Sequence, residues 1–193
     1  PVVAGGCLPF EIDYPFELQM ARTLSPLFSN ITINQNMKEC KALVMDFDGI
    51  HTNDKLFVDQ NGVESVAVSR ADGLGIDILK KIGFKLLIIT REENDVVLMR
   101  AKKLDIDIRK GVVDKISLLQ EWAKENGLKR SEIAYVGNDI NDLECMKVVG
   151  VPVAVSDAYP EIVAVARYVT DLPGGYGAVR EVCDLVYNAK IEC

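Results

Sequence analysis

The sequence has few of the residues that staple small proteins or bind transition metals. It contains one histidine and five cysteines among its 193 residues, and no two cysteines have the C-x-x-C spacing. Scattered cysteines in an odd number are typical of reduced, mostly buried thiols. This pattern disfavours both a disulfide framework and a structural zinc site.

Long apolar runs and an excess of positive charge are also missing. No apolar run approaches the roughly 18 residues of a membrane span, and the first residues lack the basic segment and apolar core of a signal peptide. A net charge of −7 disfavours nucleic acid and anionic membranes as partners. It leaves phosphorylated substrates open, because a metal and local donors can reverse the field within one cleft. We expect a cytoplasmic protein.

The residues that are present indicate one globular domain with a short appendage, because the hydrophobic fraction of 49% and the charged fraction of 26% are ordinary values. Apolar runs that predict buried strands lie at residues 41–46, 85–90, 132–136, 151–155 and 167–170. Helical apolar spacing recurs at residues 74–82, 97–104, 116–123 and 179–186. The alternation predicts an α/β fold, a doubly wound, Rossmann-like parallel sheet that binds ligands at the carboxyl ends of its strands.

Two segments depart from this alternation. Residues 55–59 and 63–69 flank an Asn-Gly pair, which is a strong hairpin signal. We predict a small β-hairpin flap there, placed where it can project over the strand ends. Residues 1–36 are interrupted by glycine, proline and asparagine, and we expect a leader without a core of its own ahead of a compact domain at residues 37–193.

Two aspartates follow the first predicted strand. Asp46 and Asp48 are separated by one residue, and Gly49 opens a turn that can bring both carboxylates over the strand end. Two carboxylates there suit Mg²⁺, a hard cation that keeps water ligands for a substrate. One carboxylate can attack phosphorus while the other protonates the leaving oxygen. The alternative is a turn that uses aspartate and glycine for its shape alone.

Further polar residues stand at the ends of later strands or the starts of helices. Thr90 can hold a phosphoryl oxygen or can begin a capping box with Glu93. Lys115 can neutralise a phosphate together with a carboxylate, or it is an ordinary surface lysine. Residues 137–142 bring an amide and two carboxylates to a strand end, unless these are helix N-caps. The only histidine, His51, is either a substrate contact or a solvated or structural residue.

These four motifs, in this order, resemble the haloacid dehalogenase superfamily of phosphatases over roughly residues 41–191. The resemblance implies that Asp46 attacks phosphorus and becomes an aspartyl-phosphate. It implies that Asp48 protonates the departing alkoxide and then activates water. Thr90 and Lys115 are then the ligands of the phosphoryl oxygens.

The same resemblance implies a Mg²⁺ site held by Asp46, by the backbone carbonyl of Asp48 and by Asn138. The family usually has aspartate where this chain has Asn138, so the site has one negative charge fewer. We expect weaker metal affinity for that reason, with Asp139 or Asp142 as the residues that compensate.

A short hairpin in place of an inserted cap domain resembles one branch of the superfamily, as do the motifs at residues 72–76, 111–115 and 174–181. That branch dephosphorylates 3-deoxy-2-keto sugar acids, of the octulosonate 8-phosphate or acylneuraminate 9-phosphate type. The resemblance implies a phosphorylated sugar acid as substrate, contacted by Asp72, Arg91 and Arg180, and a homotetramer in which a neighbouring subunit helps to close the site. Arg91 stands where the family commonly has glycine, which leaves the contacts near it open.

Residues 10–21 resemble the closing segment of acylneuraminate cytidylyltransferases, some of which carry a phosphatase-like domain at the C-terminus. We therefore expect this chain to be the C-terminal part of such a bifunctional protein. A function of another class follows from the same resemblance: a catalytically weak or silent module that oligomerises the cytidylyltransferase. Retention of the polar set around Asp46 argues against this alternative, because a scaffold has no use for it.

Overall fold

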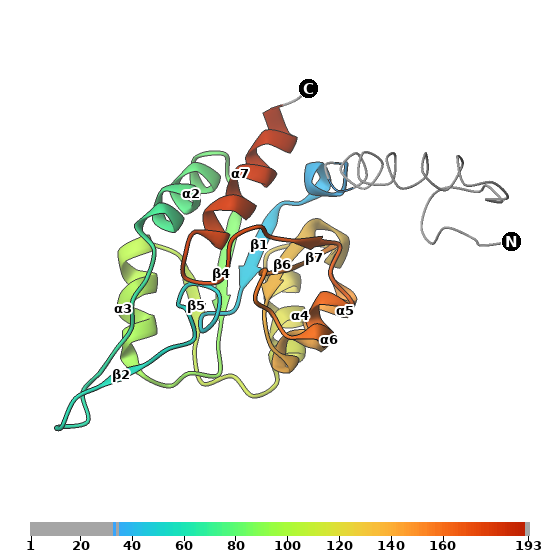
Figure 1. Cartoon of the computed structure of the whole chain (residues 1–193). Coiled ribbons are helices and arrows are strands. Elements are labelled where there is room, and N and C mark those ends of the chain that lie inside the picture. Colours follow the sequence, from blue (N-terminus) through green and yellow to red (C-terminus); the bar gives the residue numbers. More distant parts are fainter. Residues whose placement is uncertain (1–32, 34, 192–193) are drawn as a thin grey trace, which may run out of the picture.

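The computed structural model describes residue 33 and residues 35–191, and the remainder is drawn as a thin grey trace in Figure 1. The core is a six-stranded sheet with the order β5-β4-β1-β6-β7-β8, in which every neighbouring pair is parallel. The strands are β1 (Ala42–Met45), β4 (Lys85–Ile89), β5 (Asp107–Arg109), β6 (Ile133–Gly137), β7 (Val151–Ala154) and β8 (Tyr168–Val169). The predicted doubly wound α/β fold is confirmed.

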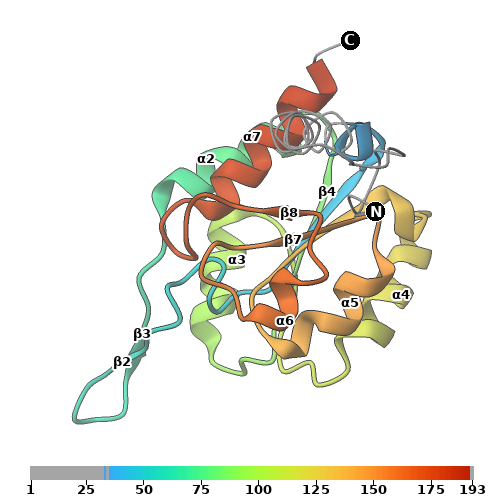
Figure 2. The same ribbon diagram turned by 45° about the vertical axis from the view of Figure 1, so that its right-hand side comes forward.

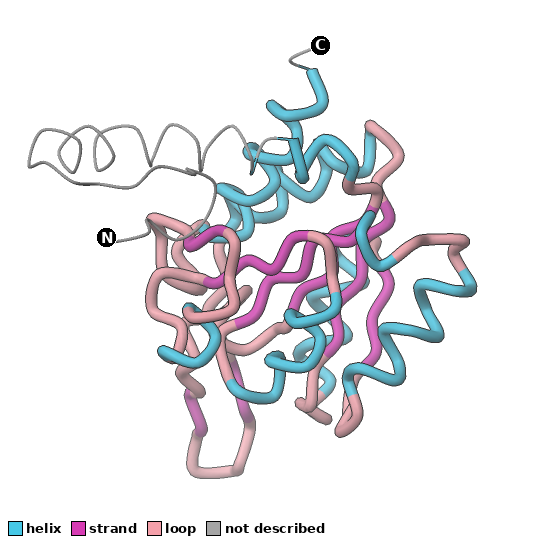
Figure 3. The backbone as a smooth tube through the Cα atoms, turned by 90° about the vertical axis from the view of Figure 1, so that its right-hand side faces the viewer, coloured by secondary structure: helices cyan, strands magenta, loops and turns pink. Residues whose placement is uncertain are grey.

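Helices cover both faces of this sheet, as the views in Figures 2 and 3 show. One face carries α2 (Arg70–Lys81), α3 (Asp95–Leu104) and α7 (Ala178–Ile191), and the other carries α4 (Lys115–Glu125), α5 (Leu143–Val148) and α6 (Pro160–Val163). Two 3₁₀ turns, η1 (Arg130–Glu132) and η2 (Ile140–Asp142), flank β6.

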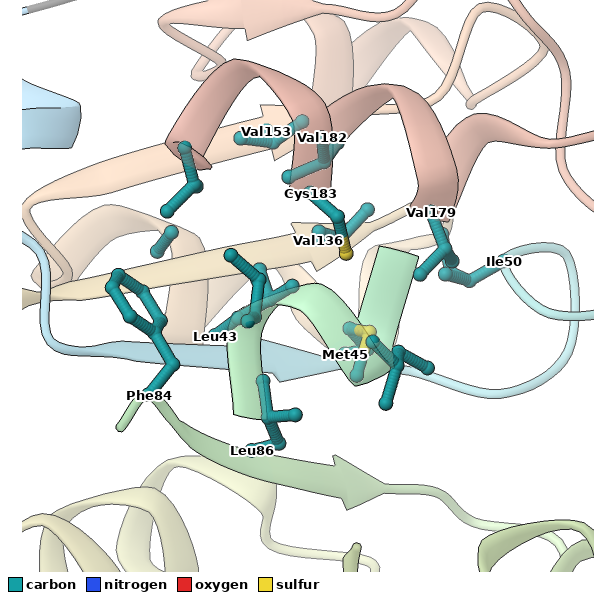
Figure 4. Packing of buried hydrophobic residues seen from close by; sticks show 14 of the residues in the cluster. Leu43, Met45, Ile50, Phe84, Leu86, Val136, Val153, Val179, Val182 and Cys183 are labelled. Atoms are coloured by element: carbon teal, nitrogen blue, oxygen red, sulfur yellow. The ribbon is translucent and has the colours of Figure 1, made fainter. Parts of the chain in front are cut away.

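The strands build both cores because successive side chains point to opposite faces of a sheet. In β1, Leu43 and Met45 belong to one apolar cluster, whereas Ala42 and Val44 belong to the other. Figure 4 shows Leu43 and Met45 on the side of the sheet that α7 covers. A strand buried on both faces reads as a continuous apolar run, which is why the sequence located β1 and β4 to within a residue or two.

The predicted hairpin is present as β2 (Phe57–Val58) paired antiparallel with β3 (Glu64–Ser65). The Asp59 carboxylate accepts the backbone N–H groups of Asn61 and Val63 at 2.9 and 2.8 Å and so fixes the turn. Its direction differs from the prediction of a flap over the strand ends. The hairpin projects away from the body in Figures 1 and 2, and its Phe57 is 62% exposed.

The strand β5 and the leader are the two remaining segments to compare with the sequence predictions. Strand β5 was not predicted, because it has three residues, of which two are charged, and therefore shows no apolar run. The leader at residues 1–36 and its likeness to a cytidylyltransferase lie almost wholly outside the described residues. Within the part of the chain that the structure describes, no helix has the length and apolar character that crossing a bilayer requires.

Candidate active site

Asp46 stands directly after β1, at the point where the strand order reverses. Its N–H continues the sheet ladder to the carbonyl of Val136 at 3.1 Å, so its position is set by the core of the sheet. The next residue leaves the sheet in a tight turn, and the Phe47 N–H donates to Asp46 Oδ1 at 2.7 Å. Gly49 has φ of +72°, and a Cβ there would fall 2.0 Å from the Asn138 side-chain nitrogen. The glycine that opens the turn is therefore required by both backbone and space.

Lys115, the first residue of α4, reaches Asp46 from the other side of the sheet end. Its Nζ lies 2.7 Å from Asp46 Oδ2 and 2.8 Å from Asp142 Oδ1, and its exposed fraction is only 2%. Burial raises the pKa of Asp46 to about 7, and the Asp142 charge adds to this, while Lys115 opposes it. Burial alone would lower the pKa of Lys115, but the two carboxylates outweigh it and raise that pKa. The surface-lysine alternative is wrong.

Asp142 faces inward, toward Lys115. Its Oδ1 also accepts the Tyr135 hydroxyl at 2.8 Å, and its Oδ2 accepts the Asn138 N–H at 3.1 Å. Gly137 makes room for it, because a Cβ at Gly137 would lie 2.6 Å from Asp142 Cβ. Both oxygens are therefore occupied, and Asp142 holds Lys115 in place. The geometry does not favour the predicted alternative in which it compensates at the metal.

Asp139 is also committed elsewhere. Its carboxylate accepts the Ile140 N–H at 2.6 Å and caps the turn η2. The N-cap reading of this residue agrees with the structure. Asn138 differs from both aspartates, because its Oδ1 is buried and has no hydrogen-bond partner in the described part of the chain. An amide oxygen without a partner among the described residues, next to the turn that follows Asp46, fits a cation ligand.

Thr90 directly follows β4, and its Oγ1 accepts the Glu92 N–H at 3.0 Å. The predicted capping box between Thr90 and Glu93 is wrong, because α3 begins at Asp95 and its N-cap is Asn94. The Thr90 hydroxyl hydrogen remains available to a phosphoryl oxygen. The backbone of Thr90 is fixed by the Arg109 carbonyl, which accepts its N–H at 3.0 Å.

A pocket of about 480 Å³ opens at this sheet edge. Its lining residues are Asp46, Asp48, Thr90, Arg91, Glu92, Glu93 and Asn141. Burial raises the pKa of Asp48, while the Thr52 hydroxyl, which donates to it at 3.3 Å, counteracts this. A carboxyl group with a raised pKa is suited to give up a proton to a leaving group and take one back.

Two residues of the site were not predicted individually. Asn141 lines the pocket, and its Oδ1 accepts from Lys115 Nζ at 3.1 Å. Tyr135 lies inside an apolar strand, where the sequence predicts only a core role for an aromatic residue. Its hydroxyl donates to Asp142. The only signal for Asn141 was its place within the polar segment 137–142.

The predicted ligand set for Mg²⁺ contains one carboxylate side chain, that of Asp46, plus the Asp48 carbonyl and the Asn138 amide. Among the described residues there is no group of three or more His, Cys, Asp or Glu side chains that could hold a metal. The set nevertheless fits Mg²⁺, which binds through one or two carboxylates and keeps waters and substrate oxygens as its other ligands.

Asp72 and Arg180 do not join this pocket. Asp72, in α2, is fully buried, and its Oδ1 accepts the backbone N–H of Arg180 in α7 at 3.0 Å. The Arg180 guanidinium instead pairs with Asp184, with Nε 2.7 Å from the carboxylate. In this chain the two predicted substrate contacts thus join two helices. Arg91, the third, does line the pocket.

His51 is also buried, with its ring stacked on Phe47 at a centroid distance of 5.7 Å. Burial lowers its pKa to about 3, so the imidazole is neutral at physiological pH. It does not line the pocket. Of the two readings of this residue, the structural one agrees with its position.

A doubly wound sheet with two carboxylates, a hydroxyl and a buried lysine at its carboxyl edge has the architecture of an enzyme. Comparison with known families identifies which one. A model of the haloacid dehalogenase-like hydrolase family matches residues 74–179. The chain is 34% identical over 151 residues to the 3-deoxy-D-manno-octulosonate 8-phosphate phosphatase of Salmonella typhi, covering 78% of this chain and 80% of the relative.

Solved structures that are similar to this chain point to the same family. The 3-deoxy-D-manno-octulosonate 8-phosphate phosphatase of Moraxella catarrhalis, in complex with magnesium, phosphate and KDO, superposes with a TM-score of 0.80 and is 38% identical, covering 82% of this chain and 92% of that one. A haloacid dehalogenase superfamily (subfamily III A) hydrolase from Legionella pneumophila gives a TM-score of 0.85 at 38% identity, covering 86% and 92%.

The chain belongs to the haloacid dehalogenase-like hydrolase family. The predicted superfamily is therefore confirmed, and so is the prediction of an enzyme.

Proposed function

We propose that this protein hydrolyses the phosphate monoester of a 3-deoxy-2-keto sugar acid, with Asp46 as the nucleophile. The observation that carries the proposal is the buried contact between Lys115 Nζ and Asp46 Oδ2 at 2.7 Å, where Asp46 lines a pocket together with Asp48 and Thr90. A nearby cation keeps a buried carboxylate ionised, and the same cation can neutralise the negative charge of the incoming phosphate.

The reaction balances in two steps. In the first, an Asp46 oxygen forms a bond to phosphorus, the bond from phosphorus to the sugar oxygen breaks, and Asp48 gives its proton to that oxygen. In the second, Asp48 takes a proton from a water molecule, whose oxygen attacks phosphorus and releases inorganic phosphate from Asp46. Thr90 and Lys115 bind the phosphoryl oxygens throughout, which fixes the in-line geometry.

Mg²⁺ is the cation that fits the proposed site, held by Asp46, the Asp48 carbonyl and Asn138. It supplies neutralisation of the negative charge on the phosphoryl group when bound. The Moraxella catarrhalis relative was solved with magnesium and phosphate, which supports this choice. The buried Asn138 Oδ1, which lacks a hydrogen-bond partner among the described residues, supports it independently.

The substrate class rests on the relatives, whose names specify 3-deoxy-D-manno-octulosonate 8-phosphate. Arg91 at the pocket rim offers a positive charge that suits the carboxylate of a sugar acid. Acylneuraminate 9-phosphate shares that carboxylate and keto-acid core and is the second candidate substrate. The relatives named above give the second candidate no support.

A substrate panel tests the proposal. Octulosonate 8-phosphate, acylneuraminate 9-phosphate, a simple hexose 6-phosphate and a nucleoside monophosphate would each be incubated with the protein and Mg²⁺. We expect phosphate release to be fastest for a sugar acid, and Asp46→Asn to lower kcat by about 10⁴-fold or more, because the nucleophile is lost. Released phosphate is the measured quantity, and a chelator is the metal control.

The panel also decides between enzyme and silent module. A silent module would release no phosphate above the Asp46→Asn background with any ester, and its Mg²⁺ titration would show no saturable binding that depends on Asp46. That result would refute the proposed hydrolase. The expected result is saturable Mg²⁺ binding that weakens in Asp46→Asn.

We also propose a homotetramer, as the resemblance implies. The hairpin supports this, because Leu56, Phe57, Val58 and Val63 expose between 48% and 62% of their surface on a projecting segment. Light scattering of the purified protein measures the assembly. The proposed origin as the C-terminal part of a cytidylyltransferase rests on residues 10–21, outside the described residues, and sequencing the natural gene upstream of this segment tests it.

A further inference from the structure

The motif at residues 174–181 does not line the pocket that Asp46 and Asp48 line. Its glycines lie in the segment between β8 and α7, which packs against the turn that carries Asp48. We call residues 47–53 the acid loop and residues 171–177 the glycine loop. The closest part of the contact between them is made by backbone on both sides, and the Asn53 side-chain amide also donates to the Tyr176 hydroxyl at 3.4 Å.

Gly174 is the point of closest approach. A Cβ at this position would lie 1.8 Å from the carbonyl oxygen of Gly49 and 3.1 Å from that of Thr52. Real Cβ atoms do not approach backbone oxygens to such distances, so any other residue would displace one of the two loops. Gly175 adds a hydrogen bond, donating its N–H to the Ile50 carbonyl at 2.9 Å, and its φ of +75° again suits glycine.

The glycine loop is itself anchored from behind. Both oxygens of Glu181 are used: Oε1 accepts the Tyr168 hydroxyl at 2.8 Å and the Asp171 N–H at 2.9 Å, and Oε2 accepts the Leu172 N–H at 3.1 Å. Asp157 Oδ1 accepts the Gly174 N–H at 3.0 Å. These contacts tie the glycine loop to the segment that follows β7 and to Glu181 of α7, which β8 holds in turn, so the loop is anchored at both ends.

Hydrogen bonds within the acid loop connect this contact to the Asp48 side chain. The Thr52 hydroxyl accepts the Gly49 N–H at 3.2 Å and donates to Asp48 Oδ1 at 3.3 Å. Gly174 therefore approaches Thr52, which holds the Asp48 carboxylate, and Gly49, which holds the Thr52 hydroxyl. A shift of either one moves the proton donor relative to the phosphate held by Thr90 and Lys115.

We propose that the Gly174–Gly175 turn is a positioning element for Asp48: it acts as a backbone support that sets the acid loop at the distance catalysis requires. This inference rests on the proposed function, because it gives Asp48 the role of acid and base. The substrate does not contact the turn in this proposal. The backbone contact is made by Gly49, Ile50 and Thr52 of the acid loop and by Gly174 and Gly175 of the glycine loop.

The test is the substitution Gly174→Ala in the full chain. Hydrogen exchange of the amides at residues 49–54 should become about tenfold faster, because the loop can no longer close against its support. With the best ester of the panel, kcat should fall about 10²-fold while KM changes little, since a misplacement of about 1 Å affects the transition state more than phosphate binding. Exchange is followed by mass spectrometry.

Gly150→Ala is the matched control. A Cβ at Gly150 would lie 2.1 Å from the carbonyl oxygen of Ser131, which is the same kind of clash between a side chain and a backbone oxygen. Gly150 precedes β7 at the amino edge of the sheet, opposite the pocket. This variant should lose thermal stability as Gly174→Ala does, but keep the exchange of residues 49–54 and the kcat of the wild type.

A gentler variant covers the case in which Gly174→Ala does not fold. Asp157→Ala removes the acceptor of the Gly174 N–H without adding an atom, at an exposed position. It should speed the exchange of residues 49–54 and lower kcat by about fivefold each, in line with the loss of one hydrogen bond.

The outcomes separate the two proposals. If the wild type hydrolyses no ester but exchange at residues 49–54 rises in Gly174→Ala alone, the proposed function fails and the support of the acid loop stands. Unchanged exchange in the folded Gly174 and Asp157 variants, or an equal rise in Gly150→Ala, overturns the support even if the wild type is an active phosphatase. Faster exchange with wild-type kcat overturns the positioning of Asp48.

Discussion

Two carboxylates in this molecule are almost equally buried and have different surroundings. Asp46 is 4% exposed and Asp72 is fully buried. Burial raises the pKa of both, to about 7 and about 6. Asp46 lies 2.7 Å from Lys115 Nζ, whereas Asp72 accepts one backbone N–H at 3.0 Å, and its Oδ2 has no hydrogen-bond partner among the described residues.

The difference follows from where each residue lies in the fold. Asp46 directly follows the central strand β1, where the sheet edge opens to a pocket and the first residue of α4 supplies the lysine. Asp72 lies between α2 and α7, where its charge meets the first turn of α7 and the helix dipole partly compensates it. A buried carboxylate is thus a candidate reagent when a cation and an opening accompany it, and a helix-joining group when they do not.

Removing the cation tests the first half of this comparison. Lys115→Met leaves Asp46 and Asp142 buried beside each other with no positive charge, and we expect a loss of about 3–5 kcal/mol in the free energy of unfolding. Phosphatase activity should fall to background, because the phosphate loses a ligand as well. Urea unfolding measures the first effect and phosphate release measures the second.

Two further variants make this result interpretable. Lys80→Met breaks an exposed pair, in which Nζ lies 2.7 Å from Asp105, and should change stability little. The double variant Lys115→Met with Asp142→Asn removes one of the two unpaired charges and should recover part of the lost stability. Equal losses in Lys115→Met and Lys80→Met would contradict the buried ion pair.

Neutralising Asp72 tests the second half. The native pKa of Asp72 lies above its unfolded value of about 3.9, so the native state holds this proton up to a higher pH than the unfolded chain does. The stability from that proton is therefore present below pH 4 and lost as pH rises to about 6. Asp72→Asn keeps an acceptor for the Arg180 N–H and should stabilise the protein by about 2 kcal/mol above pH 6, with little effect below pH 4.

The quantity to measure is the difference in unfolding free energy between Asp72→Asn and wild type across pH 4–7.5. Arg100 on α3, whose charge lowers the pKa of Asp72, and Cys183 on α7 are the other groups near it and are unchanged in both proteins. A difference that does not vary with pH would mean that Asp72 is ionised throughout that range. It would also remove the contrast with Asp46.

The sequence correctly predicted that Asp46 lies in the site, but it did not predict that Asp72 joins two helices. Both outcomes have the same physical reason. Apolar strands of a parallel sheet must end at the same edge, so polar residues that follow them are brought together whatever the details of the helices. Asp46, Asp48, Thr90 and Asn138 were located in this way. Lys115 stands at a helix start rather than a strand end, so the sequence left it open between a phosphate ligand and a surface lysine, and the family resemblance favoured the phosphate ligand.

Contacts that depend on the packing of distant elements carried no such signal. The Asp72–Arg180 contact spans 108 positions and depends on how α2 meets α7. The inward direction of Asp142 depends on one 3₁₀ turn, and a shift of one residue in that turn would bring a different side chain to Lys115. The hairpin itself was predictable from Asn-Gly, but its projection away from the body was not, because the turn residues specify only local geometry.

Tyr135 gives the finest test, because it alters the Asp46 cluster without changing a charge. Its hydroxyl donates to Asp142 at 2.8 Å, and Tyr135→Phe removes that bond while leaving the Lys115 contact and the Asn138 N–H. We expect a loss of about 1 kcal/mol in unfolding free energy and a fall in kcat of about threefold with KM nearly unchanged, since Lys115 is held less firmly.

Tyr187→Phe is the matched control for this substitution. Tyr187 packs at the edge of the other apolar cluster, and its hydroxyl makes no hydrogen bond within the described part of the chain. Its removal should leave both stability and kcat near the wild-type values. If Tyr135→Phe lowers stability but leaves kcat untouched, Asp142 needs only Lys115 and the backbone to stay in place. Tyr135 would then resemble Asp72, because it would contribute to the stability of the fold and not to kcat.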